Sequence, residues 1–367
     1  MKKRVVVAMS GGVDSSVAAA LLQKEGYEVI GITMCFSSYG ENLMYSKRRR
    51  PACCGMEGIE DARRVCHKLR IRHYVLNMQK DLEQYVIKDF CEEYLKGRTP
   101  NPCVRCNEHL KFGTLLKKAI SLDADYVATG HYARITKTPR HQDTKTPVYQ
   151  LKKGKDKLKD QSYFLYRLSQ SQLKHIIFPL GNYTKAQVRK LAREFNLPVA
   201  DKLASQEICF LADADYRGFL KSRITTAINP GMVIDSHGNI LGQHKGIAFY
   251  TVGQREGLGI ALGYPAYVIK IDPQKNCIIL GSKEDVYNNT CLVKDVRFIF
   301  PAPKKKIAVR VRIRYNHREA RAEIGPCGNK IKVRFREPQF AITPGQSAVF
   351  YDKDIVLGGG IIDRIID

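Results

Sequence analysis

The sequence lacks any apolar run that approaches the roughly 20 residues needed to span a bilayer. Its amino-terminal segment, Met1 to Met9, is basic and then apolar for only about five residues, too short for the apolar region of a signal peptide, and no cleavage site follows. We therefore expect a cytoplasmic protein with no membrane partner. The chain has 11 cysteines, an odd number, and no secretion signal, so we expect no disulfide framework. Clustered cysteines are then interpreted as catalytic, redox or metal-binding residues.

Acidic residues are also scarce. Asp and Glu number 36 against 61 Lys and Arg, which gives a formal net charge of +25 over 367 residues. So large an excess favours a polyanionic partner, either nucleic acid or an anionic membrane surface, with a generally basic proteome as the simpler alternative. The length allows two or three domains.

The first third of the chain alternates strand-like and helix-like segments. Strands are expected at 4–9, 27–34, 73–78 and 125–129, and helices at 15–26, 58–69, 81–95 and 109–121. This alternation predicts an α/β domain with a doubly wound parallel sheet, covered on both faces, that binds ligands beyond the carboxyl ends of its strands.

From about residue 230 the pattern changes to short β-rich runs between Gly, Pro and Asn turns, which predicts small β-barrel or sandwich modules. These runs are 232–235, 240–244, 266–271, 277–280, 291–300, 307–315, 330–335 and 347–351. We expect a catalytic domain at 1–204, a central β-rich domain at 205–285 and a carboxy-terminal β-barrel at 286–367.

A Ser-Gly-Gly-Val-Asp-Ser loop joins the first expected strand to the first expected helix. Glycines let the backbone approach a ligand closely, and helix amino-terminal amides favour phosphate. The loop lacks both the Gly-Lys-Ser/Thr of a Walker loop and the glycine spacing of the dinucleotide fingerprint. It resembles the pyrophosphate loop of the adenylating ATP pyrophosphatases, in which ATP activates a carbonyl oxygen as an adenylate. The residues expected to contact ATP here are Ala8, Met9, Ser10, Gly11, Gly12, Val13, Asp14 and Ser15.

Cys103 and Cys106 have Cys-x-x-Cys spacing in a loop that two prolines stiffen. Arg98 and Arg105 would favour thiolate over thiol there. Cys209 follows in a Ser-Gln-Glu-Ile-Cys-Phe motif. The alternative for the first pair is half of a structural zinc site, although no second Cys-x-x-Cys follows at zinc-ribbon spacing.

A competing cluster comprises Cys53, Cys54 and Cys66. Adjacent cysteines rarely ligate the same structural zinc. Cys66 falls on a helix face with Val65 and Leu69, and we expect it to be buried. Any role of Cys53 and Cys54 stays open.

Residues 309–315 alternate strictly between apolar and arginine side chains. In a strand, Arg310, Arg312 and Arg314 would share one face. A row of guanidinium groups suits a phosphate track, and Tyr315 could stack on a base. The alternative is the solvated outer face of a barrel.

Four separated motifs, at 10–16, 97–107, 205–210 and 244–259, together resemble the bacterial tRNA-specific 2-thiouridylase family, and 343–350 extends the likeness. The resemblance implies an adenine nucleotide alpha hydrolase-like first domain and a cytoplasmic enzyme that makes 2-thiouridine at the wobble position of tRNA. In such an enzyme ATP adenylates the C2 oxygen of uracil, a persulfide sulfur attacks C2, and AMP and pyrophosphate are released. The implied partners are tRNAs for Glu, Gln and Lys and a sulfur donor: a cysteine desulfurase, a relay protein or sulfide.

The resemblance also assigns residues. Cys106 matches the nucleophile and Cys209 the persulfide carrier. Met34 and Gly130 match further ATP contacts, and Asn101, Pro102 and Cys103 match the target-base loop. The tRNA contacts are matched by His131, Lys159, Asp160, Gln161, Arg314, Tyr315 and Gln346.

One departure opens a second sulfur route. Many family members carry Asp where this chain has Cys103. Cys103, Cys106 and Cys209 could hold a 4Fe–4S cluster with one open iron, similar to related thiolases that carry sulfide on such an iron. Persulfide and cluster therefore both stay open. An ATP pyrophosphatase acting on a small metabolite would share the loop but would need neither three cysteines nor a basic barrel.

Overall fold

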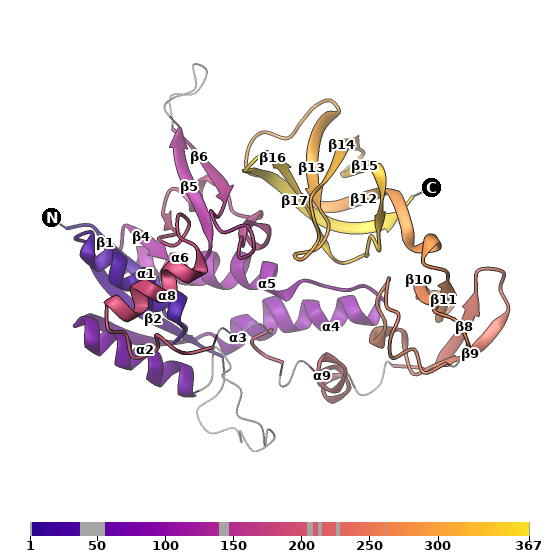
Figure 1. Ribbon diagram of the computed structural model, residues 1–367, viewed down its shortest axis with the longest axis horizontal. Helices are drawn as coiled ribbons and strands as arrows, with labels where there is room; N and C mark the ends of the chain where they lie inside the picture. Colours follow the sequence, from indigo (N-terminus) through magenta and orange to yellow (C-terminus); the bar gives the residue numbers. More distant parts are fainter. Residues whose placement is uncertain are drawn as a thin grey trace. The chain divides into compact units, whose positions relative to one another are not determined.

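The computed structural model describes residues 2–36, 56–138, 147–203, 208–211, 215–224, 228–260 and 262–366. The chain divides into two compact units, each assembled from separate stretches of sequence (Figure 1). Unit 1 comprises Met1–Val86, Cys103–Asp215 and Asp354–Val356. Unit 2 comprises Ile87–Pro102, Tyr216–Lys353 and Leu357–Asp367. No helix in these described ranges is long and apolar enough to cross a membrane.

Unit 1 is built on a parallel sheet with the strand order β3-β2-β1-β4-β7. Its strands are β1 (Arg4–Ala8), β2 (Glu28–Cys35), β3 (Arg72–Asn77), β4 (Tyr126–Ala128) and β7 (Ile176–Ile177). The central strand β1 is almost wholly apolar and buried from Val5 to Ala8, as expected for a strand covered on both faces.

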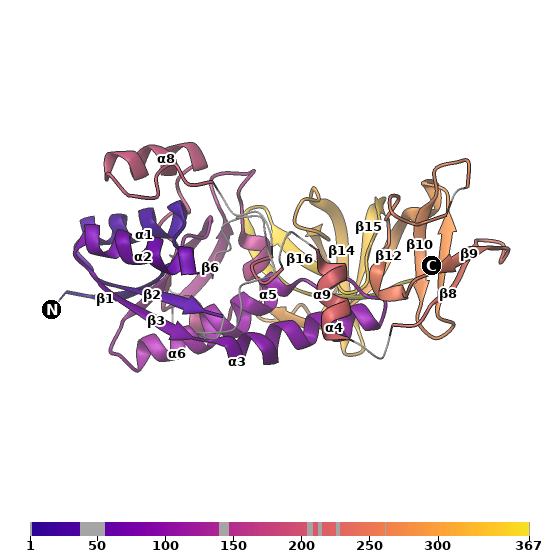
Figure 2. The same ribbon diagram turned by 90° about the horizontal axis from the view of Figure 1, so that it is seen from below.

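Helices cover both faces of this sheet, which confirms the doubly wound fold (Figure 2). On one face Val5 and Val7 pack with α1 (Val13–Lys24), α2 (Met56–Leu69) and α8 (Lys185–Glu194). On the other face Val6 and Ala8 pack with α6 (Leu115–Ile120). Unit 1 also contains the antiparallel hairpin β5 (Ala133–Thr138) and β6 (Val148–Lys153), with η3 (Ser162–Leu165) and α7 (Gln170–Leu173) after it.

The cysteine segment is helical from Pro102 onward. α5 (Pro102–Arg105) runs into the π-helical segment η2 (Cys106–Thr114) and then into α6. The expected loop up to residue 107 is therefore wrong, because proline is well suited to a first helical position. A second π-helical segment, η1 (Glu83–Ile87), joins α3 (Gln79–Leu82) to α4 (Lys88–Leu95). Such segments are rare and often accompany functional sites.

Unit 2 contains a small sheet with the order β10-β11-β8-β9 and a closed barrel. The small sheet is formed by β8 (Gly231–Asp235), β9 (Ile240–His244), β10 (Tyr267–Asp272) and β11 (Cys277–Gly281), with short η5 (Ile247–Phe249) and η6 (Glu284–Val286). α9 (Tyr216–Arg223) packs on α4, where the rings of Tyr94 and Tyr216 stack 5.0 Å apart.

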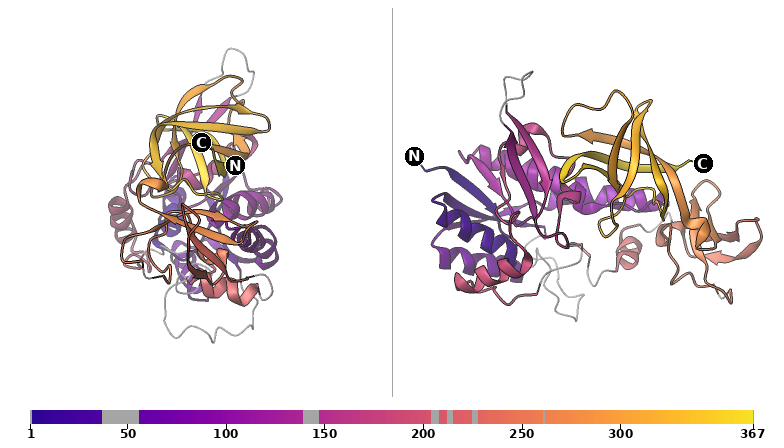
Figure 3. Two further views of the ribbon diagram at one scale, coloured as in Figure 1. Left: turned by 90° about the vertical axis from the view of Figure 1, so that its right-hand side faces the viewer. Right: turned by 45° about the horizontal axis from the view of Figure 1, so that its top comes forward.

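The barrel has the strand order β12-β15-β14-β13-β16-β17 and closes through pairing of β12 with β17 (Figure 3). Its strands are β12 (Tyr287–Phe298), β13 (Ile307–Arg312), β14 (Ala320–Cys327), β15 (Lys330–Phe340), β16 (Ser347–Asp352) and β17 (Ile355–Ile365). Val311, Ile324, Val333 and Phe350 belong to one apolar core inside it. The predicted carboxy-terminal β-barrel is confirmed.

Candidate active site

The glycine loop lies between the end of β1 and the start of α1, as predicted. Gly11 has φ +71°, and a Cβ there would lie 2.2 Å from the carbonyl oxygen of Gly58, so a larger residue would displace the backbone. The Ser15 hydroxyl accepts a hydrogen bond from the Ser10 amide at 3.2 Å and donates one to the Gly12 carbonyl at 3.1 Å. Because Gly12 is the N-cap residue, the first amides of α1 are directed at whatever fills the loop, and this arrangement suits phosphate.

Asp14, in the first turn of α1, is held by two residues that the sequence did not reveal. Lys185 Nζ lies 2.6 and 2.8 Å from the two Asp14 carboxylate oxygens, and the Tyr132 hydroxyl donates to the same group at 2.8 Å. Burial, together with the Asp14 charge, raises the pKa of Tyr132. Lys185 is the first residue of α8, which Thr184 and Gln187 cap. That capping pattern could have located the start of α8 at Lys185, but not the contact of Lys185 with Asp14.

The remaining expected ATP residues lie at the ends of neighbouring strands. Gly130 follows β4, and a Cβ there would lie 2.8 Å from both the Asp14 carbonyl carbon and the Ser15 amide nitrogen. Met34 is half-buried near the end of β2. The carboxyl ends of β1, β2 and β4 thus gather around the start of α1, where ligands bind in sheets of this kind.

Cys106 is the first residue of η2, and only 8% of it is exposed. Burial raises its pKa to about 12; Lys111 works against this shift, while Cys209 and Cys103 add to it. These effects place Cys103 and Cys209 near Cys106. The expectation of a lowered pKa is wrong for Cys106, because burial outweighs the effect of nearby cations. Arg105, the arginine nearest in sequence, pairs with Glu108. Arg98 belongs to unit 2 and pairs with Glu93.

Glu108 is a buried charge that the sequence did not single out. Its carboxylate lies 2.6 Å from Arg167 Nε, 3.3 Å from Arg105 and 3.4 Å from His109. Buried carboxylates need such partners, because an unpaired charge in the interior is costly. The cluster therefore fixes the helix turn that begins at Cys106.

The other cysteine predictions have separate outcomes. Cys66 is 1% exposed, as expected, and burial raises its pKa to about 12. Cys53 and Cys54 lie outside the described residues, as do residues 205–207 of the Cys209 motif. Within the described ranges, no three Cys, His, Asp or Glu side chains are grouped so as to hold a metal ion.

The residues of unit 1 matched to tRNA contacts are largely engaged inside the unit. His131 is buried, its Nδ1 lies 2.6 Å from the Thr129 hydroxyl, and burial lowers its pKa well below the ordinary value. The Asp160 carboxylate accepts hydrogen bonds from Gly154 and Ser162. The Gln161 side chain accepts one from the Tyr132 amide at 3.0 Å, and Lys159 is half-buried.

The arginine row of unit 2 is shorter than predicted. β13 ends at Arg312, with Arg310 exposed and Arg312 half-buried. Arg314 lies beyond the strand, and its Nη2 donates to the Val252 carbonyl at 2.9 Å and to the Thr343 hydroxyl. The strand itself therefore carries only Arg310 and Arg312 of the predicted row. Tyr315 lies with its ring centroid 5.9 Å from the Arg312 guanidinium.

Comparisons with known proteins agree with this architecture. Residues 3–213 match a family model described as "tRNA methyl transferase HUP domain", residues 217–282 one described as "tRNA methyl transferase PRC-barrel domain", and residues 288–362 one described as "Aminomethyltransferase beta-barrel domain".

Curated relatives match over almost the full length. The chain is 51% identical to "tRNA-specific 2-thiouridylase MnmA 1" of Caldanaerobacter subterraneus subsp. tengcongensis over 368 residues, covering 99% of each chain. It is 51% identical to "tRNA-specific 2-thiouridylase MnmA" of Halothermothrix orenii over 362 residues, covering 98% of each. It is 47% identical to the protein of that name from Clostridium beijerinckii over 368 residues, covering 100% of each.

Proposed function

The chain belongs to the tRNA-specific 2-thiouridylase family, and from that premise we propose that it is a tRNA-uridine 2-sulfurtransferase that consumes ATP. The observation that carries the proposal is that one compact unit contains both a glycine loop suited to phosphate at the start of α1 and two cysteines, Cys103 and Cys209, close enough to Cys106 to raise its pKa. Methyl transfer, which the description of the matching domain names, requires neither feature.

In the proposed first step, ATP binds with its phosphates at the loop of Ser10 to Ser15. The C2 oxygen of uridine attacks the α-phosphorus, pyrophosphate leaves, and the oxygen becomes part of a good leaving group. This activation is needed because the carbonyl oxygen of a pyrimidine leaves very poorly. Lys185 and Asp14 lie 2.6 Å apart at this loop. The Asp14 carboxylate would suit the Mg²⁺ that accompanies ATP, and the Lys185 ammonium would suit the phosphates.

In the proposed second step, the outer sulfur of a Cys209 persulfide attacks C2, and AMP leaves with the former C2 oxygen. The Cys106 thiolate then attacks Cys209 Sγ, which breaks the sulfur–sulfur bond, leaves one sulfur on C2 and forms a Cys106–Cys209 disulfide. An external thiol reduces that disulfide. Because burial holds Cys106 as a neutral thiol in the absence of ligands, its proton must be lost when the complex forms.

We propose the persulfide route rather than a 4Fe–4S cluster on Cys103, Cys106 and Cys209. Among the described residues no three Cys, His, Asp or Glu side chains are grouped so as to hold a metal ion, which supports this choice, and no step is assigned to a cluster. Iron and acid-labile sulfide, measured on protein purified without oxygen and on Cys103→Ala, test this choice. About four irons per chain, lost in the variant, would overturn the persulfide route.

The basic balance of the chain supports tRNA as the partner. We propose that Arg310 and Arg312 on the barrel contact phosphates, that Tyr315 stacks near them, and that Asn101, Pro102 and Cys103 receive the target base. The proposed substrates are wobble uridines of tRNAs for Glu, Gln and Lys in the cytoplasm. A cysteine desulfurase or a relay protein supplies the sulfur as a persulfide, which passes its outer sulfur to the Cys209 thiol. Sulfide would suit only the cluster route, because forming a persulfide from sulfide needs a two-electron oxidant. Catalysis is assigned to the predicted domain 1–204 together with Cys209, and tRNA binding to 286–367, with the rest of 205–285 between them.

The experiment is to incubate the protein with ATP, a sulfur donor and unmodified tRNA, and to measure AMP, pyrophosphate and 2-thiouridine by mass spectrometry. Cys106→Ser and Cys209→Ser should each abolish 2-thiouridine, and Cys327→Ser, at an exposed position, should not. AMP formation stimulated by a small amine instead of tRNA would overturn the proposal. Methylation of tRNA without ATP would do the same.

A further inference from the structure

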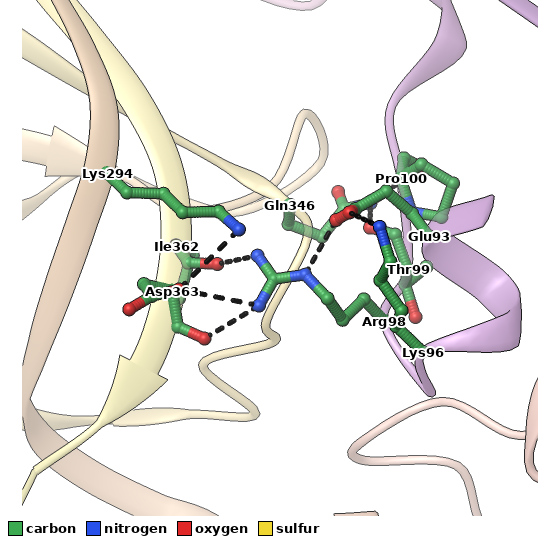
Figure 4. Close-up of polar contacts among 9 residues, drawn as sticks. All are labelled: Glu93, Lys96, Arg98, Thr99, Pro100, Lys294, Gln346, Ile362 and Asp363. Carbon is green, nitrogen blue, oxygen red and sulfur yellow. Dashed lines mark hydrogen bonds and ion pairs between the residues drawn. The ribbon is translucent and has the colours of Figure 1, made fainter. Parts of the chain in front are cut away.

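The stretch that leads into the cysteine helix folds with unit 2, although the cysteines fold with unit 1. Residues 97–102 belong to unit 2, and the next residue, Cys103, begins the second stretch of unit 1. A close-up of the contacts around this stretch shows Arg98 directed at β17, and Thr99 and Pro100 beside Gln346 (Figure 4).

Arg98 is fixed by several partners at once. Its Nη1 donates to the Asp363 carbonyl and its Nη2 to the Ile362 carbonyl, each at 2.9 Å, while its Nε donates to Glu93 Oε2 at 2.6 Å. Only 13% of the side chain is exposed. Asp363 is itself held by Lys330 at 2.7 Å. A planar guanidinium can satisfy all these acceptors together, which an ammonium group cannot do.

Hydrogen bonds hold both the backbone and the side chain of Thr99. Its amide donates to the Pro344 carbonyl at 2.9 Å, and its carbonyl accepts from Gln346 Nε2 at 2.9 Å. Its hydroxyl lies 3.0 Å from that of Thr251. Gly345 has φ +95°, and a Cβ there would lie 2.7 Å from the Thr99 nitrogen, so the turn fits only with glycine.

Two sequence motifs that the proposed chemistry does not use converge on this point. Thr251 belongs to the motif at 244–259, and Gln346 to the one at 343–350. The first motif is itself rigid, because His244 Nδ1 accepts from the Gly246 amide at 3.0 Å and its Nε2 donates to the Asn276 carbonyl at 3.0 Å. Both motifs therefore hold Thr99, which lies two residues before the target-base loop.

We propose that Arg98 and Thr99 are positioning residues through which unit 2 sets the location of Cys103 and the turn that follows it. Pro100 and Pro102 have φ restricted by their rings, so few torsions remain to absorb a displacement at Thr99 before it reaches Cys103. In an enzyme that brings a base to a cysteine, a misplacement of 1 Å can cost about a hundredfold in rate. The kinetic form of this inference rests on the proposed function.

The test variants are Arg98→Gln and Thr99→Val. The controls are Thr99→Ser, which keeps the hydroxyl, and Lys88→Gln, which changes an exposed residue of α4, the helix that also carries Glu93. Thermal unfolding checks that each variant folds. If Arg98→Gln does not fold, Arg98→Lys replaces it, because lysine keeps the positive charge but lacks the planar donor geometry of the guanidinium group. Arg98→Gln and Thr99→Val should lower kcat for 2-thiouridine at least about tenfold, with KM for tRNA and for ATP within about twofold. Thr99→Ser and Lys88→Gln should match the unaltered protein.

A second measurement does not depend on activity. Hydrogen exchange of the peptide covering 100–106 should become at least about tenfold faster in Arg98→Gln and unchanged in Lys88→Gln, because the helix start loses its anchor. Failure of the unaltered protein to thiolate tRNA would remove the proposed function, and exchange would then decide this inference alone. Unchanged exchange, or a kcat equal to that of the unaltered protein, overturns the positioning role.

Discussion

The neutral state of the Cys106 thiol can be tested through its rate of alkylation as a function of pH. With a pKa of about 12, roughly 3 × 10⁻⁵ of the molecules carry the thiolate at pH 7.5, against about a tenth for an ordinary cysteine of pKa ~8.5. Because the thiolate is the reactive form, Cys106 should react about three thousandfold more slowly than an ordinary cysteine, before any steric protection is counted. Burial should slow it further.

The assay treats the ligand-free protein with iodoacetamide without oxygen and follows the Cys106 peptide by mass spectrometry, with exposed Cys327 as internal control. The Cys106 rate should rise about tenfold per pH unit from pH 7 to 10 without a plateau. Lys111→Met should lower it, because Lys111 opposes the raised pKa, while Lys111→Arg should keep it. A plateau near pH 8 to 9, or a rate at pH 7.5 equal to that of Cys327, would refute a buried neutral thiol.

Three further predictions concern other parts of the chain. Arg310→Ala and Arg312→Ala should each weaken tRNA binding and reduce the slope of log affinity against log salt by about one, and an unchanged slope would assign this face to solvent. Burial lowers the pKa of His131 and keeps the folded protein's imidazole neutral. Below about pH 6.5 the unfolded chain binds a proton at this residue and the folded chain does not, so the free energy of unfolding falls by up to about 1.4 kcal/mol for each pH unit. Urea unfolding of His131→Gln should lack this contribution, whereas identical pH slopes would contradict it. Gly11→Ala should abolish ATP binding in calorimetry, since its Cβ would overlap the Gly58 carbonyl, and retained affinity would reject the loop as the phosphate site.

The parallel sheet was predictable because strands covered on both faces are continuous apolar runs. β1, β2 and β3 lie within a residue or two of the predicted segments. The prediction missed β5, β6, β7, β14 and β17, and the last two carry weaker patterns. β17 contains Gly358, Gly359 and Gly360, which interrupt the apolar alternation, and β14 mixes arginine, glutamate and proline with its apolar residues. Position 358 needs glycine, because a Cβ there would lie 2.2 Å from the Arg297 carbonyl oxygen of the neighbouring strand.

The candidate site likewise contains residues that the sequence could predict and residues that only the tertiary structure revealed. The glycine loop and the cysteine set could be found from sequence, because their chemistry depends on neighbouring residues. Lys185 and Tyr132, which hold Asp14, could not, since 171 and 118 residues separate them from it. The helix start at Pro102 has a local signal, a proline at the first helical position, so it too was predictable.

The sequence by itself determined the features that arise within a few residues: the buried strands, the left-handed glycine of the phosphate loop, the spacing of Cys103 and Cys106, and the positive charge. Tertiary structure alone decided how charged and titratable groups behave, because their energies depend on burial and on partners distant in the chain. Arg98, which lies close to the cysteines in sequence, instead donates to the carbonyl of Ile362, 264 residues away. Cys106, for its part, is buried as a thiol.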